Sequence, residues 1–223
     1  YIGEHTAYHH GDKSLNETII AMNHDFVGSN NINLLNPSGQ LGTRLKGGAD
    51  AASPRYVSTQ LNPLTRKIFM KEDDPLLVYL NEDGYNIEPE YYWPVIPMLL
   101  VNGTSGIGTG YSTDIPCYNP STIIEILLNL IDDEEYDIPK MIPWYKNFKG
   151  SIFQKEHGGN FNSFGVWKRV TRTEIRVSEL PIGMWTENYK ELLEKYIEAG
   201  KIDNFRNNSS EITIDFTLIM SAI

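Results

Sequence analysis

The sequence has a single cysteine, Cys117, among its 223 residues. One thiol cannot form an internal disulfide framework or a zinc site built from several cysteines, and so few thiols are typical of a reducing compartment. Hydrophobic residues make up 40% of the chain and aromatic residues 11%. This composition is globular and excludes a fully disordered chain.

Long hydrophobic runs are also missing. The longest are Val95–Val101 and Ile123–Ile131, and a proline or polar residues interrupt each of them. Both are shorter than the roughly 20 residues of a membrane-spanning helix, and no signal peptide is visible. We therefore expect no membrane partner. The chain begins on Tyr1 rather than Met and ends on an apolar stretch, so we expect it to be an excerpt of a longer protein.

Basic residues are outnumbered by acidic ones, 19 against 29, for a net charge of −10. The excess is confined to residues 71–140, which hold two basic and fourteen acidic residues. Residues 1–70 and 141–223 each carry a net charge of +1. The overall charge therefore does not exclude a polyanionic partner at either end of the chain.

The first part of the chain predicts a helix followed by a hairpin. Ser14 and Glu17 fit a capping box, and apolar residues at helical spacing extend the predicted helix over 14–26. Residues 32–35 and 40–45 flank turn-forming residues and predict two paired strands. A helix followed by a hairpin is typical of a winged-helix unit. Beyond it we expect helices over 61–69 and 73–80 and a mostly irregular segment over 94–120.

The second part of the chain predicts a mixed α/β unit. Ser121 is expected to cap a helix that ends near Ile131, and the acidic run 132–137 marks a break at the surface. The patterns that follow predict strands and one helix, namely strands over 151–154, 164–170, 174–180 and 211–216 and a helix over 186–199 that Gly200 ends. We therefore predict an α/β (α+β) fold with two domains, residues 1–118 and 119–223.

The segment Tyr8-His9-His10-Gly11-Asp12 stands at the mouth of the first predicted helix. Free backbone N–H groups and the helix dipole favour an anion there, so these residues can hold a phosphate. A solvated surface cap explains the same residues. A metal site is a poorer interpretation, because adjacent histidines cannot easily share one ion and no cysteine or carboxylate stands at ligand spacing.

Residues 42–56 combine glycines, cations and a neighbouring arginine and tyrosine. Small residues let the backbone approach a partner closely. A phenol is a poor nucleophile at neutral pH because its ordinary pKa is about 10. Arg55 beside Tyr56 can favour the phenolate and neutralise a phosphate under attack. A buried, structural Tyr56 with Arg55 in a salt bridge stays the alternative, since the chain has 13 tyrosines.

The glycine-rich segment Gly103–Gly110 allows two interpretations. A dinucleotide-binding loop requires a strand, a turn and a helix, and no helical pattern follows Gly110. Ile107 between two glycines is an apolar side chain presented by a loop, and architectural DNA-binding proteins insert such wedges between base steps. A buried loop anchor is the bland alternative for Ile107.

Together these segments resemble the breakage–reunion region of the type IIA DNA topoisomerases. The resemblance is nearly continuous over residues 4–150 and continues in outline to Glu179-Leu180-Pro181 and Trp185-Thr186. It is closer to the eukaryotic and viral branch than to bacterial gyrase. Asp12 departs from the glutamate usual in that branch, but either residue can cap a helix. The motifs that carry the resemblance are Ala7-Tyr8-His9-His10-Gly11-Asp12, Thr18-Ile19-Ile20, Phe26–Asn31, Gly42-Thr43-Arg44, Gly47-Gly48, Asp50-Ala51-Ala52, Arg55-Tyr56, Glu88-Pro89, Pro97-Met98, Val101-Asn102-Gly103, Ile107-Gly108-Thr109-Gly110, Asn119-Pro120 and Pro143-Trp144-Tyr145.

The resemblance implies a winged-helix domain at 1–118 followed by part of a tower domain at 119–223. It implies that Tyr56 attacks a DNA phosphorus to give a 5′-phosphotyrosyl link, while Arg55 stabilises the charge on the pentacoordinate phosphorus. His10 is expected beside the nucleophile as a phosphate ligand or proton acceptor. The further DNA-binding candidates are the wedge Ile107 and the residues His9, Lys13, Arg44 and Lys46.

The resemblance also implies an ATP-dependent homodimer that acts on double-stranded DNA. In the family, Mg²⁺ is held by a TOPRIM domain and ATP by a separate N-terminal domain. Neither a TOPRIM-type Asp-x-Asp motif nor an ATP-binding loop occurs here, so we expect both cofactor sites outside this chain and interpret the acidic residues 132–135 as a solvated loop. The isolated chain is expected to bind DNA weakly without cleaving it. The implied location is the nucleus for a cellular eukaryotic enzyme, or the host cytoplasm or virion for a viral one.

Two alternatives from other function classes stay open. One is a non-catalytic winged-helix module for DNA binding or protein interaction, in which Tyr56 is only structural. The other is a nucleotide-binding enzyme that uses residues 103–110.

Overall fold

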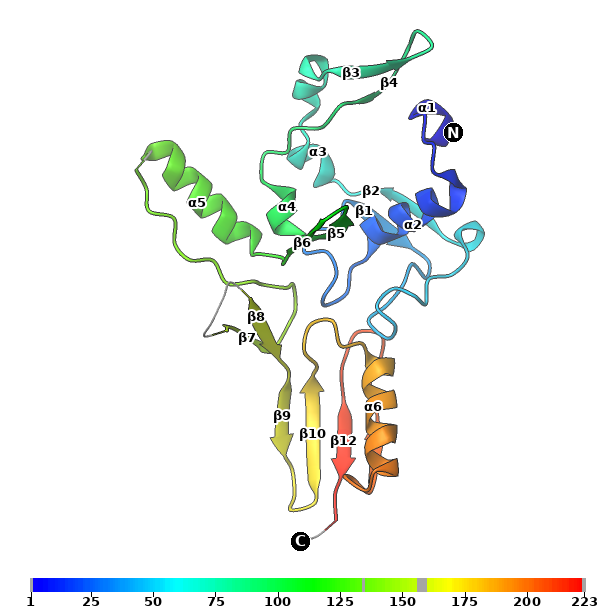
Figure 1. Ribbon diagram of the computed structural model, residues 1–223, viewed down its shortest axis with the longest axis vertical. Coiled ribbons are helices and arrows are strands. Elements are labelled where there is room, and N and C mark those ends of the chain that lie inside the picture. The colour runs from blue at the N-terminus through cyan, green and yellow to red at the C-terminus, as the bar shows by residue number, and fades with distance from the viewer. Residues whose placement is uncertain (1, 134, 156–159, 222–223) are drawn as a thin grey trace.

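The computed structural model describes residues 2–133, 135–155 and 160–221 (Figure 1). Within these residues the strands form one four-stranded and four two-stranded sheets, with antiparallel pairing. Up to residue 118 the elements are α1 (Ile2–His5), α2 (Gly11–Asn23), β1 (Leu35–Ser38), the 3₁₀ helix η1 (Pro54–Tyr56), β2 (Ser58–Leu61), α3 (Thr65–Ile68), the 3₁₀ helix η2 (Lys71–Leu76), β3 (Tyr79–Glu82), β4 (Tyr85–Pro89), α4 (Met98–Val101), β5 (Thr104–Gly108) and β6 (Tyr111–Ile115). From residue 119 they are α5 (Pro120–Asp132), β7 (Ser151–Gln154), β8 (Phe161–Phe164), β9 (Val166–Arg169), β10 (Glu174–Glu179), α6 (Thr186–Glu198), β11 (Asn204–Asn207) and β12 (Phe216–Ile219).

Helix α2 begins and ends about three residues earlier than the sequence predicts. Its N-cap residue is His10, which makes no side-chain capping bond. The hydroxyl of Ser14 instead accepts a hydrogen bond of 3.1 Å from the Tyr8 hydroxyl. The expected capping box is therefore wrong, because Ser14 lies inside the first helical turns rather than at their start.

The predicted hairpin uses a different second strand. β1 pairs with β2, so that Leu35 lies opposite Leu61 and Ser38 opposite Ser58. Residues 40–45, the expected partner, form a loop because Gly42 has a φ of +106° and turns the chain back on itself. The long connection between β1 and β2 therefore carries this loop and η1.

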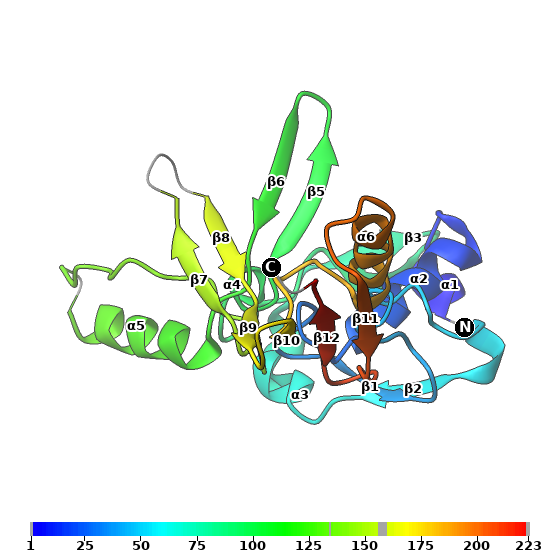
Figure 2. The ribbon, with the colours of Figure 1, turned by 90° about the horizontal axis from the view of Figure 1, so that it is seen from below.

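Residues 61–115 contain less helix and more strand than predicted. Only α3 remains of the helix expected over 61–69, and 3₁₀ helix η2 and strand β3 replace the helix expected over 73–80. The segment 94–120, expected to be mostly irregular, contains α4 and the β5–β6 hairpin. Figure 2 shows this hairpin projecting from the body of the protein. Gly110, at φ +82°, allows the tight turn that closes it.

In the second half of the chain the predictions over 151–154, 174–180 and 186–199 are confirmed to within one residue by β7, β10 and α6. The N-cap of α5 is Asn119 rather than Ser121, since the Asn119 side chain accepts a bond from the Ser121 N–H. The strand predicted over 211–216 is wrong. That segment is a loop until β12 begins, and β11 occupies a stretch for which no strand was predicted.

The main apolar core lies between α6 and the sheet of order β11-β12-β10-β9 (Figure 1). Leu193 on the inner face of α6 and Phe216 on β12 are fully buried. Val177 and Leu180 continue the same cluster on and just after β10. This packing of a helix on an antiparallel sheet confirms the predicted α/β class.

A buried asparagine joins three distant segments. The Asn31 amide donates bonds of 3.0–3.1 Å to the carbonyls of Val101, Tyr118 and Trp144, and its oxygen accepts a bond of 2.8 Å from Lys146 N–H. A polar group that is buried without a partner destabilises a fold. Asn31 therefore fixes the end of α4, and with it the base of the β5–β6 hairpin, against the rest of the chain.

We predict that Asn31→Ala lowers the free energy of unfolding by about 3 kcal/mol, because it strands several buried backbone groups. Urea unfolding of the 223-residue chain measures the change. Asn30→Ala is the matched control, since Asn30 bonds two carbonyls nearer the surface, and we expect it to cost about 1 kcal/mol. Equal losses for the two variants would contradict the role of Asn31.

Candidate active site

Tyr56 lies at the end of η1, the short 3₁₀ helix that follows the loop. Pro54 occupies its first position, and the turn is held by a bond of 2.9 Å from Tyr56 N–H to the Ser53 carbonyl. The Tyr56 side chain is 76% exposed, and Arg55 beside it is also exposed. The alternative of a buried Tyr56 is therefore wrong.

Other tyrosines in the chain are poorer nucleophile candidates. Burial raises the pKa of Tyr145 to about 12, because the phenolate is disfavoured away from water. Burial also raises the pKa of Tyr189, which packs edge-on against Phe216 in the core. The phenolate is the nucleophilic form, so a solvent-accessible phenol next to a cation is better suited to attack a phosphate.

The loop Gly42–Asp50 before η1 is closed on itself. A Cβ atom on Gly42 would lie 2.7 Å from Gly48 Cα, so the two backbone segments touch. The Thr43 N–H donates a bond of 2.8 Å to the Asp50 carboxylate, and the Thr43 hydroxyl bonds the other carboxylate oxygen. These contacts give a compact support for the residues that lead to Tyr56.

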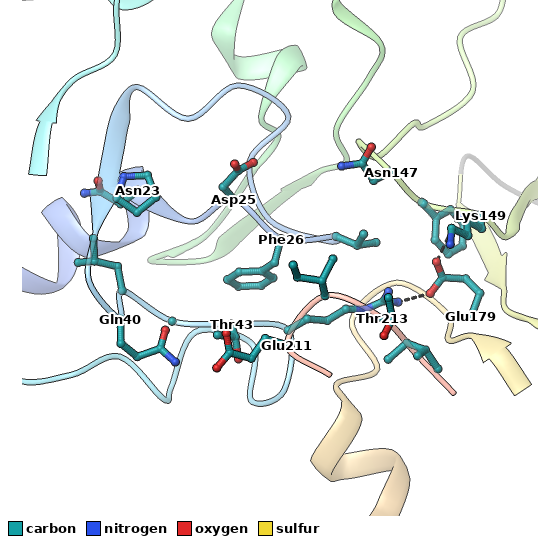
Figure 3. Close-up of a pocket in the computed structure, with 18 of the residues that line it drawn as sticks. Asn23, Asp25, Phe26, Gln40, Thr43, Asn147, Lys149, Glu179, Glu211 and Thr213 are labelled. Carbon is teal, nitrogen blue, oxygen red and sulfur yellow. Dashed lines mark hydrogen bonds and ion pairs between the residues drawn. The ribbon is translucent and has the colours of Figure 1, made fainter. Parts of the chain in front are cut away.

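Arg44 does not occupy the position expected of a DNA contact. Its side chain is 4% exposed and forms an ion pair with Glu179, which is 2% exposed, at the end of β10. Figure 3 shows this ion pair at the wall of a cavity of about 690 Å³. A buried guanidinium that is already paired cannot reach a DNA backbone, so this expectation is wrong. Lys46, in the same loop, is exposed.

Helix α2 brings its N-terminal turn close to the residues before Tyr56. Lys13 on α2 and the segment Gly48–Pro54 line one cavity of about 690 Å³. Lys13 is exposed and lies 3.8 Å from the Glu17 carboxylate. His10, at the N-cap of α2, is exposed and packs edge-on against Tyr8. The first turn of α2 and the Tyr56 loop therefore lie side by side.

His9 lies toward a different element. Its Nε2 atom is 3.7 Å from an Oε1 atom of Glu82 on β3, and both side chains are largely exposed. The surrounding cavity, of about 650 Å³, lies between the N-terminal residues and the β3–β4 hairpin. The structure thus separates His9 from its neighbour His10 in surroundings, which the sequence could not show.

Ile107 lies near the tip of the β5–β6 hairpin and is 94% exposed. The alternative of a buried anchor is therefore wrong. At the hairpin base, Asn102 accepts a bond of 2.9 Å from Ile32 N–H and donates one of 2.8 Å to its carbonyl. Residues 103–110 form an antiparallel hairpin and not a strand–turn–helix unit, so the nucleotide-binding alternative is also wrong.

His24 follows α2 and packs beneath the loop. A Cβ atom on Gly48 would lie 2.4 Å from its Cε1 atom. Its Nε2 atom is buried with no hydrogen-bond partner among the described residues. Burial lowers the pKa of His24, and a backbone bond to Leu41 and the charge of Asp50 oppose that shift. The imidazole is therefore held in its neutral form.

Sequence reasoning missed the roles of several residues that hold the site. Glu179 shares the buried face of β10 with Val177, and a charge at a buried position of an alternating strand is a signal for a paired partner. Asn31 and Asn102 give no such signal, because isolated asparagines are common in loops. Their partners only become visible in three dimensions.

Within residues 2–133, 135–155 and 160–221, no group of three His, Cys, Asp or Glu side chains lies together in a way that could hold a metal ion. Glu134, part of the acidic run 132–135, lies outside the described residues. None of the helices in the described part of the chain is long and apolar enough to cross a membrane.

Comparison with known proteins identifies the family. The family model for the A-type polypeptide of DNA gyrase/topoisomerase IV matches residues 1–222. The chain belongs to the type IIA DNA topoisomerases. This topoisomerase chain is 49% identical over 221 residues to the mitochondrial DNA topoisomerase 2 of Dictyostelium discoideum, covering 99% of the chain and 17% of that relative. It is 50% identical over 223 residues to DNA topoisomerase 2 of Bombyx mori, covering 97% of the chain and 14% of that relative.

A solved structure supports the same relationship. The topoisomerase II DNA-binding, cleavage and re-ligation domain of Plasmodium falciparum superimposes with a TM-score of 0.94 at 48% identity, over 99% of this topoisomerase chain and 30% of that one. The resemblance to the eukaryotic branch is confirmed. The topoisomerase chain spans about one sixth of the length of the curated relatives it matches.

We predict that the free energy of unfolding falls as the pH decreases below about 6.5, the ordinary pKa of histidine. The folded-state pKa of His24 is lowered, so the unfolded chain takes up the proton first and acid favours unfolding. Urea unfolding of the chain at pH 7.5 and 5.5 measures the difference. In His24→Gln the difference shrinks. His9→Gln, at an exposed histidine, is expected to keep the wild-type difference, and a His24→Gln variant that kept it too would refute the assignment.

Proposed function

We propose that this chain is the breakage–reunion part of an ATP-dependent type II DNA topoisomerase, which cuts both strands of a duplex, passes a second duplex through the gap and reseals it. The observation that carries the proposal is Tyr56, an exposed phenol beside the Arg55 guanidinium at the end of a supported loop. The family membership supplies the context in which such a phenol meets DNA.

The chemistry proposed for Tyr56 is a reversible transesterification. The Tyr56 Oη atom attacks a backbone phosphorus, a new Oη–P bond forms, and the bond from phosphorus to the 3′ oxygen breaks. The phenolic proton leaves to a base, and the departing 3′ oxygen takes up a proton to become a hydroxyl. The product is a 5′-phosphotyrosyl link, and the phosphodiester energy is kept for religation because no water is consumed.

The residues around Tyr56 are assigned to charge stabilisation and DNA contact. Arg55 stabilises the negative charge on the pentacoordinate phosphorus, since a guanidinium matches phosphate oxygens. His10 is the proposed phosphate ligand or proton acceptor. Its position at the start of α2, next to the Tyr56 loop, supports this role. Lys13 and Lys46 are exposed cations suited to backbone phosphates, and His9 is a further candidate.

Ile107 is proposed to wedge between base pairs and bend the duplex held for cleavage. An almost fully exposed isoleucine at the tip of a projecting hairpin supports this assignment (Figure 2). Bending a duplex costs about 1–6 kcal/mol, which extra contacts along the bent DNA offset.

The remaining assignments concern the longer subunit. We propose that residues 1–118 form a winged-helix domain and residues 119–223 part of a tower domain, in a subunit that works as a homodimer on double-stranded DNA. Other domains of the subunit would hold Mg²⁺ and ATP, and the steps above use the residues of this chain alone. A cellular eukaryotic enzyme of this kind would work in the nucleus, and a virus-encoded one in the host cytoplasm or the virion.

We predict that Tyr56→Phe abolishes covalent protein–DNA complexes, because the attacking oxygen is gone while the exposed ring is kept. Full-length subunit is incubated with supercoiled plasmid and denatured, and the protein-linked linear DNA is measured. Tyr85→Phe is the matched control at a tyrosine of equal exposure, 77%, on β4, and keeps the wild-type yield. Covalent complex at wild-type yield in Tyr56→Phe would favour the non-catalytic DNA-binding module instead.

We predict that Ile107→Ala lengthens the end-to-end distance of bound DNA, measured by energy transfer between labels at its ends, because the wedge is removed. The fold stays intact, since an exposed side chain leaves no cavity when it is shortened. Ile212→Ala, at an isoleucine that is 82% exposed outside the hairpin, is the control and leaves the DNA bent. An unchanged distance in Ile107→Ala would exclude the wedge.

A further inference from the structure

The loop that precedes Tyr56 is fastened to the sheet of the second half of the chain by a buried ion pair. Arg44 Nη2 bonds Glu179 Oε1, and the two residues are 135 positions apart. Glu179 is itself held in place, since its carboxylate accepts bonds of 2.9 Å from Leu180 N–H and 3.2 Å from Lys149 N–H. The guanidinium therefore meets a carboxylate whose orientation is fixed by backbone (Figure 3).

The same loop caps helix α6. The N–H groups of Thr186 and Glu187, in the first turn of the helix, donate to the carbonyls of Arg44 at 3.4 Å and Leu45 at 3.0 Å. The first N–H groups of a helix have no partner within the helix, so the loop satisfies them. A Cβ atom on Gly47 would lie 2.2 Å from the Trp185 ring, which therefore packs directly on the loop backbone.

The fastened loop and Tyr56 form one continuous support. Thr43 and Asp50 close the loop, and Ala52 N–H donates a bond of 2.8 Å to the Gln40 carbonyl. η1 begins two residues later, and Val57 leads directly into β2. A displacement of Arg44 would therefore be transmitted through a short, hydrogen-bonded segment to the Tyr56 hydroxyl.

Stability alone is a weak reason for a buried ion pair. Two buried charges lose their hydration, and a well-packed apolar pair in the same place is often as stable or more so. Arg44 Nε is also buried without a hydrogen-bond partner among the described residues. What the ion pair adds is direction, because the planar guanidinium matches a carboxylate in few orientations.

We propose that Arg44 and Glu179 are positioning residues for Tyr56: their ion pair sets where the nucleophile loop stands relative to the sheet of β10 and to helix α6. The inference rests on the proposed function of Tyr56. Neither residue touches DNA in this role. They act through the loop, so that a change in the ion pair alters the rate of phosphoryl transfer and leaves DNA binding unchanged.

The test measures single-turnover cleavage and DNA affinity separately, in the full-length subunit. In Arg44→Lys the charge is kept and the planar geometry is lost, and we expect the cleavage rate constant at saturating DNA to fall about 10- to 100-fold, since a misplacement of about 1 Å can cost that much. The DNA concentration for half-maximal cleavage is expected to stay within about twofold. Purely structural damage would instead lower the fraction of active enzyme and leave the rate constant of the remainder unchanged.

A second variant guards against failure to fold. Arg44→Met combined with Glu179→Met replaces the ion pair by apolar side chains, which buried sites of this kind often tolerate. We expect thermal unfolding close to that of the wild type and cleavage as slow as in Arg44→Lys. Wild-type cleavage rates in this double variant and in Arg44→Lys would overturn the proposal.

The matched control is a second arginine–carboxylate pair on the same strand. Arg176 on β10 makes two bonds to the Asp215 carboxylate, at 2.7 and 2.9 Å, but it is half-exposed and far in sequence from the loop. Arg176→Lys should cleave at the wild-type rate, and equal slowing in it would also overturn the proposal. Tyr56→Phe, run in parallel, separates the two levels. If Tyr56→Phe still forms covalent complex, both proposals fall; if it is inactive while Arg44→Lys is as fast as wild type, only the positioning role falls.

Discussion

The buried contact between the loop Gly42–Asp50 and the α6–β10 region is the constraint on which the exposed part of this structure depends. A nucleophile that must meet a DNA backbone has to stand in solvent, where few contacts can fix it. The structure solves this by burying the support instead of the nucleophile. Arg44 pairs with Glu179, Trp185 packs on Gly47, and only the end of the segment, at Tyr56, is left exposed.

The β5–β6 hairpin follows the same rule with neutral groups. Ile107 is nearly fully exposed at the tip, while Asn102 at the base exchanges two hydrogen bonds with the backbone of Ile32. The next buried amide, Asn31, holds α4 from the other side. Asparagine suits such junctions, because one side chain can donate and accept at once and carries no charge that would have to be neutralised on burial.

The sequence predicted best what depends on neighbouring residues. Helix α6 and strands β7 and β10 have strong local periodicity, and the motif around Arg55 and Tyr56 marked the candidate nucleophile. Partners distant in sequence were beyond the reach of local patterns. The strand that pairs with β1 was misplaced because glycines at Gly42 and Gly48 fold the nearer candidate into a loop. Arg44 was taken for a DNA contact because its carboxylate partner lies 135 residues away.

Arg44 and Tyr56 also show why charge in a DNA-binding segment is a poor guide to contact. The stretch 42–56 offers Arg44, Lys46 and Arg55, and from sequence the three are equivalent cations. In the fold, burial divides them: Arg44 is neutralised by Glu179, while Lys46 and Arg55 remain exposed. Because a phosphate can only be approached by cations that keep access to solvent, two of the three are available to DNA, and the third is free to hold the loop that presents Tyr56.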